Sequence, residues 1–63
     1  MYYALMLLDR ADLLGEYDDL GEAEAALARL VDGEPKLVDV AGIVPHDENG
    51  KPAGEPIMHP AAA

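Results

Sequence analysis

Four side chains that could bind a metal ion lie in the last third of the chain. His46, Asp47 and Glu48 are consecutive, and His59 follows beyond a turn signal at Asn49-Gly50. Imidazoles and carboxylates are common ligands of divalent transition metals. A hairpin closing at this turn would bring His46 and Asp47 towards His59. The spacing matches no known ligand pattern, however. We therefore expect a solvated turn and an unrelated tail histidine, with no metal and no cofactor.

A second set of possible catalytic groups consists of carboxylates in the first third of the chain. The set is Asp9, Asp12, Glu16, Asp18, Asp19 and Glu22. Two carboxylates can act as acid and base, as in glycoside hydrolysis, but this chemistry needs a cleft that sets their two pKa values apart. A domain this small seldom contains such a cleft. The set could instead form an acidic surface that imitates nucleic acid and occupies the binding site of a basic protein.

Residues for covalent catalysis are missing. The sequence contains no Cys, Ser or Thr, so acyl transfer through a thiol or hydroxyl has no nucleophile. Gly42, Gly50 and Gly54 are isolated and form no phosphate-binding loop. The tyrosines lie at predicted core or interface positions, where packing explains an amphipathic ring. We expect that the protein is not an enzyme.

The charge is strongly unbalanced. The chain has 13 acidic and 4 basic residues, a net charge of −9 and a sequence pI of about 4.2. Such a surface repels nucleic-acid phosphates and anionic membranes, so we expect no direct binding to either. Residues 2–8 are apolar but too few to cross a bilayer, and no basic segment precedes them as in a secretory signal. The sequence predicts a cytoplasmic protein.

The length of 63 residues indicates one domain close to the lower size limit for independent folding. Such a chain buries only about 60% of its extended surface, and small domains usually gain further stability from disulfides, metals or partner chains. Without cysteine, disulfides are excluded. Association with itself or with a larger partner is the expected supplement.

The clearest predicted element is a helix over residues 19–33. Asp19 can cap its N-terminus, and Glu22 can complete a capping box. Gly33 can adopt the left-handed conformation that ends a helix, and Pro35 prevents its continuation. An apolar stripe at helical spacing needs a flat apolar surface to pack on: Leu20, Ala23, Leu27, Leu30 and Val31.

Two strands are predicted before this helix. Residues 2–8 are continuously apolar, which is typical of a strand buried on both faces, and residues 13–17 return after a turn at residues 9–12. Alternation places Tyr3, Leu5 and Leu7 on one face and Tyr2, Ala4, Met6 and Leu8 on the other. Residues 3–14 also fit helical spacing, so a helical hairpin followed by a β-hairpin is the alternative fold.

A second predicted hairpin follows the helix. Residues 37–44 are rich in Val and Ile, residues 46–51 form a turn, and residues 52–58 are a short edge strand limited by prolines. The fold class is therefore α+β: a ββαββ domain over residues 1–58, with one helix on a mostly antiparallel sheet, and a flexible tail over residues 59–63.

A sheet covered by one helix leaves its other face open, and an open apolar face usually marks an interface. We expect a non-catalytic module that forms a homodimer, or docks on another protein, through this face. The alternatives are the acidic nucleic-acid mimic described above and an accessory subunit of a larger complex. The candidate interface residues are Tyr2, Tyr3, Leu5, Met6, Leu8, Val40 and Ile43.

Overall fold

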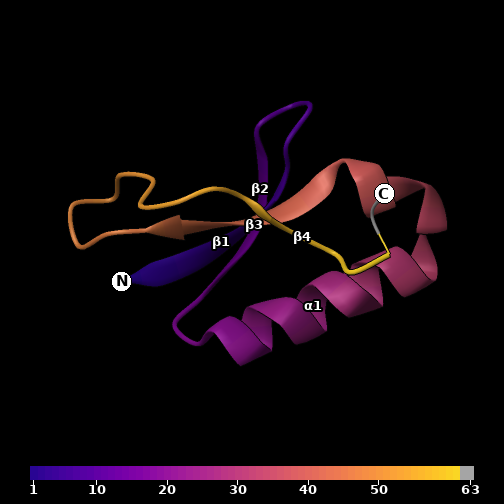
Figure 1. The fold of residues 1–63 in the computed structure, drawn as a ribbon, viewed down its shortest axis with the longest axis horizontal. Helices are drawn as coiled ribbons and strands as arrows, with labels where there is room; N and C mark the ends of the chain where they lie inside the picture. The colour runs from indigo at the N-terminus through magenta and orange to yellow at the C-terminus, as the bar shows by residue number, and fades with distance from the viewer. Residues whose placement is uncertain (62–63) are drawn as a thin grey trace.

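The structure, a computed structural model, describes residues 1–61. Four strands form one antiparallel sheet in the order β2-β1-β3-β4, and one helix crosses a single face of it (Figure 1). The elements are β1 (Tyr2–Leu7), β2 (Asp12–Tyr17), α1 (Leu20–Gly33), the 3-10 helix η1 (Pro35–Asp39), β3 (Ala41–His46) and β4 (Ile57–Met58). The predicted α+β fold with hairpin–helix–hairpin order is confirmed. The helical interpretation of residues 3–14 is wrong, because these residues form most of β1, the turn after it and the first half of β2.

Helix α1 begins at the predicted place, with Asp19 as its N-cap. Asp19 has extended backbone angles, and its carboxylate accepts a hydrogen bond from the Glu22 backbone N–H at 3.2 Å. The helix ends at Gly33 as predicted, but the left-handed conformation expected there is wrong, because Gly33 is still helical and its φ is not positive. Glu34 closes the helix instead, by donating its N–H to the Leu30 carbonyl. Pro35 then starts η1, where its fixed φ fits the first turn of a new helix.

The third predicted strand begins later than expected. Residues 37–39 belong to η1, and β3 starts at Ala41. Leu37 and Val38 are apolar and partly buried against the core, so one helical turn satisfies their hydrophobicity as well as a strand would. The β-branched composition of this segment therefore did not determine its backbone conformation.

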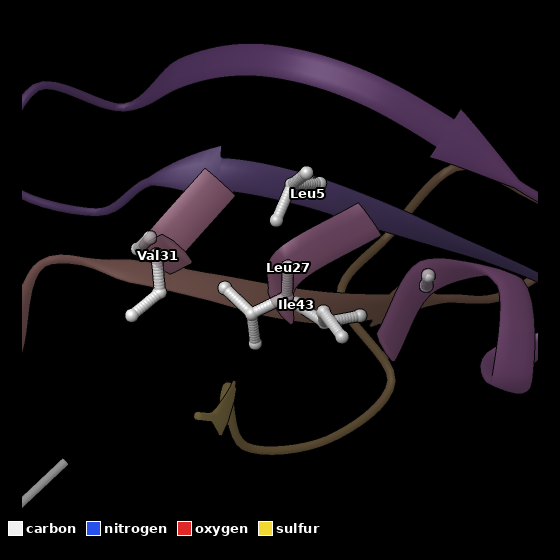
Figure 2. Close-up of a cluster of buried hydrophobic side chains, with 6 residues drawn as sticks. Leu5, Leu27, Val31 and Ile43 are labelled. Atoms are coloured by element: carbon white, nitrogen blue, oxygen red, sulfur yellow. The ribbon is translucent and has the colours of Figure 1, made fainter. Parts of the chain in front are cut away.

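The hydrophobic core lies between the sheet and α1. Its buried side chains come from β1 (Leu5), α1 (Leu27 and Val31) and β3 (Ile43), and Figure 2 shows them meeting between the two layers. Ala23 and Ala41 are both fully buried, and their small side chains let the helix approach the sheet closely.

The turn after β3 forms where the Asn-Gly signal predicts it. The Asp47 carboxylate accepts hydrogen bonds from the backbone N–H groups of Asn49 and Lys51, at 2.9 and 3.0 Å. Gly50 has a φ of 78°, a conformation that side chains rarely adopt. A single bridge joins His46 to Pro52. The chain then forms a loop over residues 53–56 before it pairs with β3 again as β4.

Candidate interaction surface

The helix covers the face of the sheet that carries Tyr3, Leu5 and Ile43. Leu5 and Ile43 are buried in the core and Tyr3 packs against it. These three predicted interface residues therefore do not lie on the open face. Val40 lies in the turn between η1 and β3, where its carbonyl accepts a hydrogen bond from the Leu8 N–H at 2.7 Å. Val40 lines a hollow at that end of the molecule with Leu7 and Arg10.

The other face of the sheet, which we call the open face, has no helix over it (Figure 1). The pairing register sets its membership, since residues directly opposite each other on neighbouring strands share a face. It carries the other three predicted interface residues, Tyr2, Met6 and Leu8. In full, the open face consists of Tyr2, Ala4, Met6, Leu8, Leu13, Glu16, Gly42, Val44, His46 and Met58.

Side chains converge at the centre and at one end of the open face. A Cβ atom built on Gly42 would lie 3.0 Å from Leu8 Cδ1 and 3.0 Å from Met58 Sδ, so these two side chains close over Gly42. At the end of the sheet, the rings of Tyr2 and His46 stack with centroids 4.8 Å apart and planes 6° from parallel. The His46 Nδ1–H donates to the Val44 carbonyl at 2.9 Å. Aliphatic and aromatic side chains therefore make up most of the open face.

The open face carries almost no charge. Glu16 is its one acidic residue, and it contains no Lys or Arg. Leu13, beside Met6 on the edge strand, is 55% exposed, so the apolar surface continues to the β2 edge. In a chain with a net charge of −9, this surface stands out because the acidic groups lie around it instead of on it.

The acidic residues singled out in the sequence gather along the β2 side of the molecule. All six are exposed. Asp9 and Asp12 lie at one end of β2, Glu16 lies within it, and Asp18 and Asp19 follow its other end, close to Glu22 in the first turn of α1. Arg10 makes only a long contact of 4.0 Å with Asp9. The six carboxylates therefore form an edge, not a cleft.

The two histidines lie far apart. His46 ends β3, whereas His59 follows Met58, which pairs with Gly42 near the start of β3. Strand spacing separates the two by roughly 13–16 Å. The His59 Nδ1 accepts a hydrogen bond from the Ala61 N–H at 3.0 Å. Within residues 1–61, no group of three His, Asp or Glu side chains is placed to hold a metal ion.

The predicted tail is only partly within the described residues. His59 is half-buried, and Pro60 lines a hollow of about 230 Å³ between α1 and β4 together with Leu27, Ile57 and Met58. This volume is below the roughly 300 Å³ at which small-molecule pockets begin. The prediction for Ala62 and Ala63 lies outside the described residues.

Leu14 is a surface residue that the sequence analysis did not single out. The pairing of β1 with β2 slips between Leu5 and Met6, so Leu14 has no direct partner and forms a bulge. Leu14 is 46% exposed and lines a wide groove between β2 and α1. The only signal in the sequence is Gly15, which follows Leu14 directly, because a glycine inside a strand often marks a bulge or a close approach.

In the part of the chain that the structure describes, no helix is both long and apolar enough to span a membrane. Comparisons of the chain with protein-family models, with curated proteins and with solved structures gave no significant match.

Proposed function

We propose that the protein is a non-catalytic self-association module whose homodimer forms by packing the open faces of two sheets against each other. The observation that carries the proposal is a contiguous apolar face with a single carboxylate on a chain with a net charge of −9. An apolar surface that no element of the chain covers is typical of an interface.

The distribution of charge is compatible with a second copy as the occupant of this face. Two protomers that meet face to face bring Tyr2, Met6, Leu8 and Met58 into contact, and Glu16 lies on the edge strand, where it keeps access to water. Most acidic groups stay outside the contact, so the net charge opposes the dimer only through screened, longer-range repulsion. Packing of two sheets about 10 Å apart through apolar side chains is a common arrangement.

The required contact area makes the centre of the face decisive. A stable interface buries about 800 Å² on each partner, which is about a fifth of the 4061 Å² that one protomer exposes. The dimer must therefore bury a large continuous area, which includes Met6 and its neighbours at the centre of the open face. A charged side chain at the centre of the open face would be cut off from water in the dimer.

The two edges of the sheet are poorer sites for self-association. On one edge, β4 has two residues and follows Pro52 and Pro56, which cannot donate backbone hydrogen bonds. On the other edge, pairing of β2 with a second β2 would bring Glu16 and its acidic neighbours together.

A cytoplasmic location is part of this proposal. A domain of 63 residues that works outside the cell would normally need disulfides, and this chain has no cysteine. Its stability would come from the second protomer instead.

The proposal is tested by replacing Met6, at the centre of the open face, with Asp. Analytical ultracentrifugation of M6D should show a monomer under conditions in which the unmodified protein is a dimer. The matched control is Ala25→Asp, which adds the same charge on the exposed side of α1 and should leave the dimer intact. A dimer that persists in M6D, or is lost equally in A25D, would refute the open face as the interface.

A further inference from the structure

The outer side of β2 is an unpaired strand edge. β2 is the terminal strand of the sheet, so one side of its backbone faces no other strand. The Leu8 N–H donates to the Val40 carbonyl, and this bond shows which residues of β1 form hydrogen bonds with which neighbouring strand. Even-numbered residues of β1 therefore direct their backbone groups to β3, and odd-numbered ones to β2.

This alternation identifies which backbone groups of β2 are free. Tyr3 and Leu5, both odd-numbered, are paired with Tyr17 and Gly15. These two residues of β2 therefore direct their N–H and C=O groups inward, to β1. Glu16 lies between them and directs its N–H and C=O outward, where a further strand could bind them.

A groove lined by apolar side chains and Arg29 runs beside this edge, on the helix side of the sheet. It is a wide and shallow depression between β2 and α1. Leu14, held there by the bulge, is 46% exposed at its margin. A strand added to β2 would place every second side chain in this groove. The residues that line it are Leu5, Leu14, Tyr17, Ala26, Arg29 and Leu30.

The charges around the edge determine its occupant. Glu16 projects from the open-face side, and acidic residues flank both ends of β2. A second copy of this chain would bring like charges together along the new pair of strands. Side chains with positive charge would meet these carboxylates favourably.

We propose that the free edge of β2 binds an extended segment of another protein in which Lys or Arg alternates with apolar residues. The segment adds a fifth strand to the sheet: its backbone pairs with Glu16, its apolar side chains enter the groove beside Leu14 and Tyr17, and its basic side chains lie near the Glu16 carboxylate. The site shares Glu16 with the margin of the open face, but its groove lies on the helix side of the sheet and its backbone contacts do not depend on the proposed dimer.

The test uses a synthetic peptide of alternating Lys and Val with blocked ends. Hydrogen exchange followed by NMR should show the Glu16 amide exchanging freely in the protein alone and at least about tenfold more slowly with peptide bound. The control peptide has the same side chains but carries N-methyl groups on alternate backbone nitrogens, which removes its ladder donors. It should bind much more weakly and leave the Glu16 amide unprotected.

A charge-reversal pair separates this edge from general attraction to an acidic protein. Glu16→Lys should weaken peptide binding by about tenfold or more. Glu55→Lys makes the same charge change in the loop before β4, at the opposite edge, and should change the affinity by less than about twofold at moderate salt.

Three results would overturn the proposal. They are equal binding of the two peptides, binding without protection of the Glu16 amide, and protection of that amide by raised protein concentration alone, which would assign the edge to a second copy. The M6D variant should still bind the peptide. These experiments therefore distinguish a failure of the proposed dimer from a failure of the proposed peptide binding at the β2 edge.

Discussion

Leu5 and Met6 are neighbours on β1 that face opposite sides of the sheet. The same substitution should therefore have different effects at the two positions. Leu5 is 4% exposed beneath α1, whereas Met6 is half-buried on the open face. We predict that Leu5→Asp unfolds the protein. Met6→Asp should leave the fold intact and remove self-association.

The size of the difference follows from burial. Removing a buried Leu side chain costs about 2–5 kcal/mol, and burying a carboxylate without a partner costs several more. A domain of this length has a total stability of about 3–9 kcal/mol at the usual value per residue. Leu5→Asp therefore exceeds what the fold can tolerate. Met6→Asp loses about 1 kcal/mol of apolar contact within the protomer, because its carboxylate stays in water.

Urea unfolding followed by circular dichroism measures both variants. Protein concentration must be held constant and low, since a dimer adds stability that depends on concentration. A25D serves again as the control for an added charge on a solvent-facing position. A folded L5D, or an M6D that unfolds as readily as L5D, would mean that the helix covers the other face of the sheet.

Two further predictions concern local structure. Asp19→Ala removes the carboxylate that accepts the Glu22 N–H and should lower the free energy of unfolding by about 1 kcal/mol, measured by urea unfolding; an unchanged midpoint would mean that this cap contributes nothing. Gly50→Ala forces a side chain onto a residue with a φ of 78° and should cost about 1 kcal/mol. Gly54→Ala is its control, since the added methyl meets only Pro45 Cγ at 3.7 Å, and equal losses in the two variants would contradict the turn geometry.

Much of the fold could be predicted because local signals agreed with one another. Asp19 marks the start of α1, the apolar spacing of Leu27 and Val31 gives its buried face, and Asn49-Gly50 marks the second turn. Each of these signals acts within a few residues, so no knowledge of the tertiary structure was needed.

The choice of covered face could not be predicted from β1 itself. Both of its faces are apolar, and alternation alone cannot say whether Leu5 or Met6 lies under the helix. The decision comes from β3, where Ala41 and Ile43 are fully buried against α1 while Gly42 lies beneath Leu8 and Met58. The small Ala41 lets the helix approach closely, which is a property of packing between distant segments.

Two other differences between the sequence prediction and the structure also arise from contacts between elements. Gly33 does not need its conformational freedom because Pro35 starts a 3-10 helix immediately after α1. The groove beside β2 depends on a bulge at Leu14, and bulges arise from the pairing of two strands. Sequence patterns describe single elements well, but they do not specify how two elements meet.

The central claim is that the open face pairs with a second copy, and the mass of the protein in solution tests it most directly. Light scattering after size exclusion, at low and at high salt, should give twice the chain mass of 6.7 kDa in both. An apolar contact is insensitive to salt or strengthened by it, because salt screens the repulsion between two acidic protomers. A monomer under both conditions at tens of micromolar would contradict the account. A dimer that dissociates at high salt would also contradict it, because its contact would have to be ionic.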